Sequence, residues 1–280
     1  MLKVADLSDE LSGCEFGDAR LTNRARKLAD AISQKPNVSI PAALQSKADM
    51  EACYRFFNNE KVTPEKIREP HIEATRGRIE LLDFVLLVQD TTELDLTRPE
   101  QQVEGAGPMD CEARRGAFYH PMIAFDVDGV ALGIIGQMIW TREEISKASK
   151  AEKNKRRKQT PIEEKESYRW LEGLQCAERT AAACPATTCV CVGDSESDIY
   201  DVFVAANRSG QANLQLLVRA GQNRNTTDGQ DWADQVRKTD KIGDQTVTIR
   251  GRKAKIGNGK SVRSLKWTPC TGPRTGLYKV

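Results

Sequence analysis

The stretch Phe84-Val85-Leu86-Leu87-Val88-Gln89-Asp90-Thr91-Thr92 decides the fold expected for this chain. Its first five residues form a continuous apolar run, which is typical of a central strand covered on both faces of a sheet. Asp90 follows that run, and a second apolar run, residues 187–192, ends in the same way at Gly193-Asp194. Because ligands bind at the carboxyl ends of strands in α/β sheets, both aspartates are candidates for one site.

The elements around these two runs follow a definite order. The polar residues 96–116 predict a loop, and Asp128-Gly129 predicts the turn of a hairpin. After the first strand, the patterns predict a hairpin at 120–126 and 130–140, a helix at 162–183, a strand at 187–192, a helix at 195–207 and a strand at 214–218. The order strand, hairpin, helix, strand, helix, strand predicts an RNase H-like mixed sheet with helices on its faces.

The first 80 residues predict helices instead of strands. Asp18 can cap a helix that ends near residue 33, and Thr63-Pro64 begins a longer helix to about residue 79. Two short helical patterns lie between them, at 40–45 and 48–58. The domains expected are a helical unit at 1–80, a sheet-based unit at 81–244 and a β-rich tail at 245–280.

The composition indicates a globular protein and excludes several classes. Among 280 residues, 39% are hydrophobic and 29% are charged, with a net charge of +2, so the chain is not of the disordered type. Neither a membrane span nor a signal segment is visible, which predicts a cytoplasmic protein. The eight cysteines form no C-x-x-C pair and only two histidines are present, so we expect reduced core cysteines and no zinc site.

Charge is unevenly distributed along the chain. Residues 245–280 contain no acidic residue, and Glu196 is the last glutamate of the sequence. A second basic run covers residues 147–158. Such runs are found both in solvated loops and in nucleic-acid-binding patches, and charge alone favours the solvated loop.

Asp90 and Asp194 have two interpretations from the residues alone. An aspartate at the junction of a strand and a loop often caps a turn or the next helix, and Asp194 is well placed for that. Two carboxylates in one crevice also attract Mg²⁺ or Mn²⁺, and a pair of such ions can activate water or a 3′-hydroxyl for phosphodiester chemistry. A phosphatase of the haloacid-dehalogenase type is disfavoured, because Thr92 stands where that class needs a second aspartate.

Several short blocks together resemble one known family. They are Phe16-Gly17-Asp18-x-Arg20-Leu21-x-x-Arg24, Ala52-Cys53-Tyr54-Arg55-Phe56-Phe57-Asn58-Asn59, Val88-Gln89-Asp90-Thr91-Thr92, Arg115-Gly116-x-x-x-His120, Asp194-Ser195-Glu196-Ser197-Asp198-Ile199-Tyr200 and Leu217-Val218-Arg219. In this order and spacing, over about residues 15–220, they resemble the bacterial cut-and-paste transposases of insertion-sequence family four, the family of the transposon-five transposase.

The resemblance implies a DDE transposase. Such a protein has a helical N-terminal domain that binds the terminal repeats of the transposon as double-stranded DNA, and it works as a homodimer on DNA in association with the nucleoid. Its RNase H-like domain holds two Mg²⁺ or Mn²⁺ ions with two aspartates and a glutamate. Asp90 matches the first aspartate and Asp194 the second. Thr91, Glu196 and Asp198 belong to the motifs around them and are expected to support the metal ligands.

The resemblance also assigns DNA contacts to basic residues that would otherwise pass for solvated surface charges. The expected DNA-binding residues are Arg20, Arg24, Arg26, Lys27, Arg55 and Arg219. The helix at 48–58 suits base contacts in the major groove, and the guanidinium groups suit phosphate contacts. We expect the aromatic side chains of Tyr54, Phe56 and Phe57 to lie in the core rather than on bases.

The sequence departs from the family at the third acid. In the family this glutamate lies on a late helix beyond a β-rich insertion, and here no glutamate follows Glu196. We therefore expect an α/β protein with a small helical N-terminal DNA-binding domain and an incomplete, C-terminally truncated RNase H-like mixed-sheet catalytic domain. Two functions are open: a metal-dependent transposase that lacks its third acid, or an inactive DNA-binding remnant that could inhibit the full-length enzyme.

Overall fold

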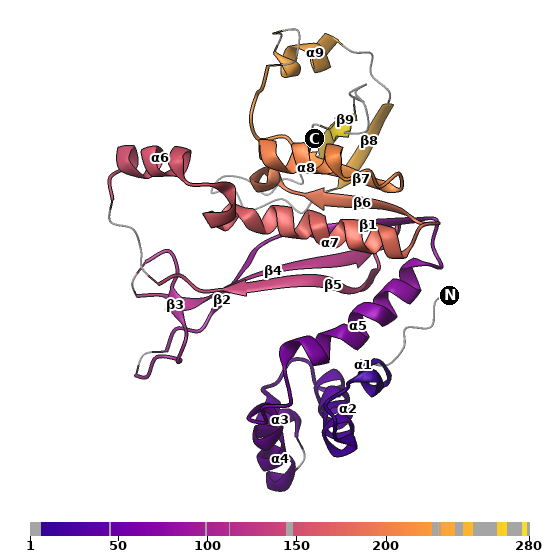
Figure 1. The fold of residues 1–280 in the computed structure, drawn as a ribbon, viewed down its shortest axis with the longest axis vertical. Helices are drawn as coiled ribbons and strands as arrows, with labels where there is room; N and C mark the ends of the chain where they lie inside the picture. Colours follow the sequence, from indigo (N-terminus) through magenta and orange to yellow (C-terminus); the bar gives the residue numbers. More distant parts are fainter. Residues whose placement is uncertain are drawn as a thin grey trace.

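The computed structural model describes residues 7–44, 46–98, 100–111, 113–143, 148–225, 229, 231–238, 243–248, 262–267 and 276–278. A helical N-terminal region leads into a mixed sheet with helices packed against it (Figure 1). The predicted α/β class, with helices first and a mixed sheet second, is confirmed. Among the described residues, no helix has the length and apolar character needed to cross a membrane.

The N-terminal helices begin where the sequence provides capping side chains. They are α1 (Leu7–Glu10), the 3₁₀ turn η1 (Leu11–Gly13), α2 (Ala19–Gln34), α3 (Ile40–Ala43), α4 (Lys47–Phe57) and α5 (Pro64–Ile79). Asp18 accepts a hydrogen bond from the backbone N–H of Arg20, and Thr63 caps α5 with Pro64 in the first turn. Phe16 and Phe56 meet edge to face in the small core of this region.

The sheet contains the strands that the sequence predicts, in the same chain order, and three short strands that it does not predict, one of which, Gly107–Pro108, lies in the segment 96–116 that is predicted as a loop. Its strands are β1 (Phe84–Gln89), β2 (Thr92–Asp95), β3 (Gly107–Pro108), β4 (Arg115–Phe125), β5 (Ala131–Trp140), β6 (Thr188–Gly193), β7 (Leu214–Arg219) and β10 (Gly276–Tyr278). β1 lies between antiparallel β4 and parallel β6, β5 extends the sheet beyond β4, and β7 runs parallel to β6. β8 (Gly243–Thr248) and β9 (Val262–Trp267) form a separate antiparallel pair.

The helices that follow the N-terminal region differ slightly from the predicted ranges. They are α6 (Lys150–Gln159), α7 (Arg169–Ala183), α8 (Tyr200–Arg208) and α9 (Trp232–Lys238), with 3₁₀ turns η2 (Ile162–Glu164), η3 (Glu166–Tyr168) and η4 (Ser195–Ser197). The helix predicted over 162–183 therefore starts later, after two 3₁₀ turns. The helix predicted over 195–207 is divided into η4 and α8.

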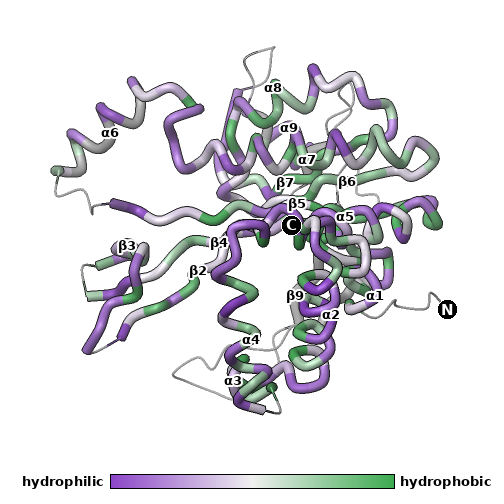
Figure 2. Tube along the Cα trace, turned by 60° about the horizontal axis from the view of Figure 1, so that its bottom comes forward, coloured by the Kyte–Doolittle hydropathy of each residue, from purple (hydrophilic) through white to green (hydrophobic). Residues whose placement is uncertain are grey.

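One face of the central sheet forms the main core. Val85 and Leu87 of β1 are fully buried against Trp170 and other apolar side chains of α7, and hydrophobic segments of α7, β6 and β7 lie together in Figure 2. The expectation that β1 is covered on both faces is wrong, because Phe84 is 38% exposed and alternate residues are only half-buried. A continuous apolar run in the sequence does not by itself show whether one or both faces of a strand are covered by neighbouring elements.

A buried ion pair joins the N-terminal helices to the sheet. Glu10 of α1, whose side chain is 5% exposed, binds Arg78 and His71 of α5 at 2.5 Å each. The Nε2 atom of His71 accepts a hydrogen bond from the backbone N–H of Ile134, and the Nε of Arg78 donates to the carbonyl of Leu132. Helix α5 is thereby tied to α1 at one side and to β5 at the other.

The cysteines of the described residues behave mostly as expected. Cys189 and Cys191 share one strand face and are fully buried, and burial raises the pKa of each thiol to about 12. Cys111 is exposed, so the expectation that every cysteine lies in the core is wrong there. Cys270 lies outside the described residues.

Candidate active site at the ends of two parallel strands

The two predicted aspartates stand at equivalent places on neighbouring strands. β1 and β6 pair in parallel, with Val88 opposite Val192. Two residues further along the same register, Asp90 falls opposite Asp194, just beyond the carboxyl end of each strand. Neighbouring strands lie about 4.8 Å apart, so the backbone brings both aspartates to one edge of the sheet.

Asp194 combines a capping role with an ion pair. One carboxylate oxygen accepts a hydrogen bond from the N–H of Glu196 at 2.7 Å, so Asp194 caps η4 as one of its two interpretations predicts. The other oxygen lies 3.3 Å from the guanidinium of Arg219, which also donates to the hydroxyl of Ser195 at 3.0 Å. The side chain of Arg219 is 58% exposed, so it stands beside Asp194 at the surface.

Asp90 opens onto a small polar cavity. Its Oδ1 accepts a hydrogen bond from the N–H of Thr91 at 2.8 Å, and its side chain is exposed. The cavity has a volume of about 280 Å³. Its lining residues are Asp90, Thr91, Glu93, Phe118, Trp140, Arg142, Glu166, Arg169 and Glu196.

Two arginines of this cavity were not singled out from the sequence. Arg169, in the first turn of α7, donates from Nε to the hydroxyl of Thr91 at 2.8 Å and from Nη2 to Glu196 at 2.7 Å. Arg142 forms two parallel hydrogen bonds with the carboxylate of Glu166, at 2.5 and 2.6 Å. This pairing lowers the pKa of Glu166, so its carboxylate is held in the charged form. The only sign of Arg169 in the sequence was its position directly before the apolar residues Trp170 and Leu171 at the start of α7.

A buried chain of hydrogen bonds supports the loop that carries Asp90. His120 contacts the hydroxyl of Thr91 at 2.9 Å through Nδ1 and the side-chain oxygen of Gln89 at 3.1 Å through Nε2. Gln89 in turn donates to the sulfur of Cys191 at 3.3 Å. Desolvation, with a smaller effect from the charge of Arg169, lowers the pKa of His120 to about 4, so the ring is neutral at pH 7.

The direction of this chain follows from its two ends. At one end the Nε–H of Arg169 donates to the hydroxyl of Thr91, and at the other the amide nitrogen of Gln89 donates to Cys191, so the Gln89 oxygen accepts from His120. Nδ1 of His120 is then an acceptor, and the hydroxyl of Thr91 donates to it. The ring then carries its proton on Nε2 and donates to the oxygen of Gln89. Every member is satisfied in one arrangement, which fixes the neutral tautomer of His120 and orients Thr91 next to Asp90.

Asp198, predicted to support the second aspartate, holds a different loop. Its buried carboxylate accepts hydrogen bonds from the N–H groups of Gly221 and Gln222 at 2.7 Å each, and it also pairs with Arg224. Asp198 therefore fixes the loop after β7, which carries the backbone away from Arg219. Its contact with the candidate site is indirect.

The five predicted N-terminal DNA contacts divide into two groups. Arg20, Lys27 and Arg55 are exposed, although Arg20 bonds Asp18 within its own helix end. Arg24 pairs with Asp49 at 3.2 Å, which joins α2 to α4, and Arg26 donates to the carbonyl of Ser8 at 3.1 Å. Arg24 and Arg26 thus make contacts within the protein that hold the helices together.

The aromatic residues of α4 also divide. Phe56 is buried as expected. Tyr54 and Phe57 are 55% and 51% exposed, so the expectation that they lie in the core is wrong. Tyr54 and Phe57 face solvent because the core of this small helical unit is too small to cover three large rings. Two aromatic rings and the guanidinium of Arg55 are consequently presented on the surface of α4.

The two aspartates are the residues that the sequence predicts as metal ligands, and Asp194 is not among the residues that line the cavity at Asp90. Among the residues that the structure describes, no group of three or more His, Cys, Asp or Glu side chains is placed to hold a metal ion. Mg²⁺ is commonly bound by one or two carboxylates and completes its shell with water and substrate phosphates. Asp90 and Asp194 carry oxygen atoms of the kind that Mg²⁺ prefers, and Asp194 is paired with Arg219. Glu196 and Glu166 are paired with Arg169 and Arg142.

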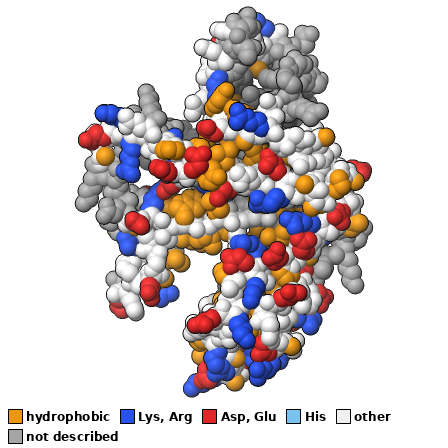
Figure 3. Space-filling view, in the orientation of Figure 1, with side chains coloured by type: hydrophobic (Ala, Val, Ile, Leu, Met, Phe, Trp, Pro, Cys, Tyr) orange, Lys and Arg blue, Asp and Glu red, His pale blue; other side chains and the backbone are white. Residues whose placement is uncertain are grey.

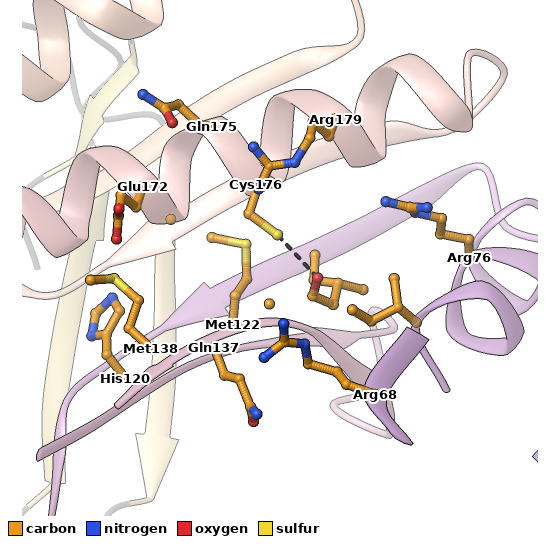
Figure 4. Close-up of a pocket in the computed structure, with 14 residues that line it drawn as sticks. Arg68, Arg76, His120, Met122, Gln137, Met138, Glu172, Gln175, Cys176 and Arg179 are labelled. Carbon is orange, nitrogen blue, oxygen red and sulfur yellow. Dashed lines mark hydrogen bonds between the residues drawn. The ribbon is translucent and has the colours of Figure 1, made fainter. Parts of the chain in front are cut away.

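A larger cavity lies away from the aspartates, between α5, β5 and α7. It has a volume of about 420 Å³ and includes Arg68 and Arg76 from one helix and Arg179 from the other (Figure 4). Cys176 at its wall donates to the carbonyl of Ile135 at 3.1 Å. Neither aspartate lines this cavity, so its size does not make it the candidate active site.

Comparison with known proteins identifies the N-terminal region. Residues 5–62 match the model of the transposase DNA-binding family. The match covers α2 and α4, the helices that carry Arg20, Lys27 and Arg55. It supports the assignment of this helical region to the transposases, which the sequence blocks predicted.

Two solved structures show a weaker likeness. They are the Mos1 transposase paired-end complex with the left transposon end and the Mos1 strand transfer complex, at 11% and 10% sequence identity. Each alignment covers 69% of this chain and 57% or 56% of the Mos1 chain, with TM-scores of 0.23 and 0.22. The aligned part spans little more than half of the Mos1 chain, and TM-scores of this size do not establish a shared fold.

Proposed function

We propose that this chain is a DNA transposase of the DDE type, related to the bacterial insertion-sequence family four. Its N-terminal helices bind the double-stranded terminal repeats of a transposon, and its sheet carries out metal-dependent phosphodiester cleavage and strand transfer. The match of residues 5–62 to the transposase DNA-binding family carries the proposal. The strand order of the sheet supports the RNase H-like part.

The surface of α4 supports the DNA-binding half. Tyr54, Arg55 and Phe57 are exposed on one short helix, and the cations of Arg20 and Lys27 lie on α2 beside it. A helix of this kind can enter the major groove while neighbouring cations contact phosphates. We propose that α4 reads the terminal repeat and α2 positions it.

The paired aspartates support the catalytic half. Asp90 and Asp194 lie at the carboxyl ends of neighbouring parallel strands, and their oxygens suit Mg²⁺ or Mn²⁺. Two such ions would stabilise the attacking and the leaving oxygen in an in-line displacement at phosphorus. Water and oxygen atoms of the DNA would complete the coordination of the ions. The active form is a homodimer on DNA.

The proposal is tested with two DNA duplexes and one divalent cation. A gel shift compares a duplex that contains the terminal repeat of the element with a scrambled duplex, and strand cleavage is then measured with Mg²⁺ and with EDTA. We expect tighter binding of the repeat duplex and Mg²⁺-dependent nicking. Asp90→Asn and Asp194→Asn should abolish nicking and leave binding intact, while Asp201→Asn, an exposed aspartate on α8, should change neither.

One observation favours a second candidate. The described residues contain no cluster of three potential metal ligands, which is what a DNA-binding protein without cleavage activity would show. Such a protein would bind the repeats and compete with an active transposase. Selective binding without nicking in Mg²⁺ or Mn²⁺ would select this candidate, and equal binding of both duplexes would contradict the proposal that α4 reads the repeat.

A further inference from the structure

Helix α6 has an unusual composition for a helix of a globular protein. Six of its ten residues are Lys or Arg, Glu152 is its one acidic residue, and Ala151 is its one apolar residue. Lys155 and Arg156 are exposed. A helix without an apolar face gains almost nothing by packing, and cations three or four residues apart repel one another.

The helix forms because its start is capped. Ser149 accepts a hydrogen bond from the N–H of Glu152, and Glu152 binds back to the N–H of Ser149 at 2.8 Å. This capping box also places a carboxylate at the positive end of the helix dipole. The sequence therefore builds an ordered, highly cationic helix where a flexible basic loop would need no cap.

The position of α6 connects it with the candidate active site. The helix lies in an excursion of the chain between β5 and η3, and it stands apart from the sheet in Figure 1. Lys and Arg side chains appear at that corner of the surface in Figure 3. The two ends of the excursion, Arg142 and Glu166, bind each other through two hydrogen bonds and both line the cavity that contains Asp90.

Arg142 is fixed on a second side as well. Its guanidinium lies 4.2 Å from the ring centre of Phe118, another residue of the same cavity, and donates to the carbonyl of Met109 at 3.2 Å. The base of the excursion is therefore fixed at the cavity, and α6 lies farther out on the same excursion. A polyanion that reaches Asp90 would meet the base of the excursion that carries α6.

We propose that α6 is an arm that binds the phosphate backbone of double-stranded DNA next to the Asp90 cavity, without reading its sequence. The inference rests on the proposed function, because it assumes that the DNA to be cleaved enters this cavity. It adds a second contact region to the N-terminal helices, with a different task. The N-terminal helices select the terminal repeat, whereas α6 holds the DNA that flanks the scissile phosphate.

The test uses the full chain and the salt dependence of DNA binding. Lys155→Gln/Arg156→Gln removes two exposed cations from α6, and Arg208→Gln/Lys238→Gln removes two exposed cations from α8 and α9 as the matched control. Binding of a 40-base-pair duplex, with the terminal repeat at one end or fully scrambled, is followed by fluorescence anisotropy over a series of KCl concentrations. Circular dichroism verifies that both variants fold.

Each phosphate contact that is lost should reduce the slope of log K against log salt by about 0.9. We expect the α6 variant to lose up to about 2 in slope and to lose affinity by the same factor on both duplexes. The control variant should keep the wild-type slope. If the salt slope of the α6 variant equals that of the control variant, the proposal that α6 binds DNA is wrong. It is also wrong if the α6 variant loses affinity only for the repeat duplex, because that result would indicate that α6 reads sequence.

The experiments distinguish a failure of the proposal for α6 from a failure of the proposed transposase function. If the α6 variant behaves like its control while Asp90→Asn abolishes nicking, the arm is wrong and the transposase function stands. If the α6 variant shows the reduced slope and no nicking occurs in any sample, α6 binds DNA in a protein without cleavage activity. A wild-type chain that binds neither duplex overturns both.

Discussion

Arg169 donates a hydrogen bond from Nε to the hydroxyl of Thr91, 2.8 Å away, and the same guanidinium reaches Glu196 at 2.7 Å. Thr91 follows Asp90 after β1, and Glu196 lies two residues after Asp194, which follows β6. One side chain of α7 thus connects the two loops that carry the candidate metal ligands. The planar fork of an arginine can make both contacts at once, and a lysine cannot.

Arg169→Lys should therefore loosen the two loops while it preserves the charge. If the chain cleaves DNA, we expect Mg²⁺-dependent nicking to fall by about 10- to 100-fold, with DNA affinity unchanged, as is usual when a group that orients a metal ligand is lost. Arg179→Lys, on an exposed position of the same helix, serves as the control. Equal nicking rates and equal melting temperatures in the two variants would refute this role of Arg169.

The buried His120 should make stability depend on pH. Its pKa is about 4 in the folded protein and 6.5 ordinarily, so between these values the unfolded chain binds a proton that the folded protein excludes. The stability that this exclusion contributes is complete above pH 6.5 and is lost as the pH falls toward 4. We expect the free energy of unfolding to drop by about 2 kcal/mol between pH 7 and pH 5 through this group.

Urea unfolding of the wild type and of His120→Gln at both pH values measures that drop, which the variant should lack. Proton NMR of the wild type gives an independent check, since the chain has only two histidines. One imidazole should show no titration between pH 7 and pH 5. Two titrating imidazoles in that range would contradict the buried neutral ring.

The buried ion pair between α1 and α5 should be a large contributor to stability. Glu10→Gln leaves Arg78, whose side chain is 13% exposed, without its carboxylate partner, and the loss should be about 3 kcal/mol. Glu73→Gln is the matched control, because Glu73 pairs with Arg76 on the same helix but is 60% exposed. That change should cost less than about 1 kcal/mol.

Thermal or urea unfolding of the two variants tests the difference directly. A similar loss in both would mean that the contact between α1 and α5 is solvated in solution. Limited proteolysis adds a second readout, because release of α1 should expose residues 7–18 to cleavage in Glu10→Gln alone.

A side chain at Gly173 on α7 should fit only if Gln89 moves aside. A Cβ atom there would lie 1.8 Å from the side-chain oxygen of Gln89, the group that accepts the hydrogen bond of His120. Gly173→Ala should therefore displace Gln89 and destabilise the protein by about 1–3 kcal/mol. Gly77→Ala, in α5 with no atom within 4 Å of its Cβ, should instead stabilise by about 0.5–1 kcal/mol.

The two alanine variants have the same chemistry in two helices, so opposite shifts in melting temperature are the expected result. Shifts of the same sign would show that helix propensity outweighs the contact with Gln89. A changed NMR shift of the His120 ring in Gly173→Ala would link the effect to the buried chain of hydrogen bonds.

Local patterns in the sequence determined the elements of this protein. Asp18 and Thr63 cap helices by accepting nearby N–H groups, and apolar runs form strands at 84–89 and 188–193, because these effects act over a few residues. The sequence also predicted that aspartates follow both strands. It did not predict β2, since the four residues Thr92–Asp95 are exposed and their pairing with β4 is a long-range contact.

Only the tertiary structure decided which side chains meet. The parallel register places Asp90 opposite Asp194, and long-range packing brings Arg169, Thr91, His120 and Glu196 together across separations that no local pattern encodes. The same packing buries Phe56 and leaves Tyr54 and Phe57 exposed. Burial and hydrogen bonding depend on what covers a residue, and that is set by the whole fold rather than by the residue's own segment.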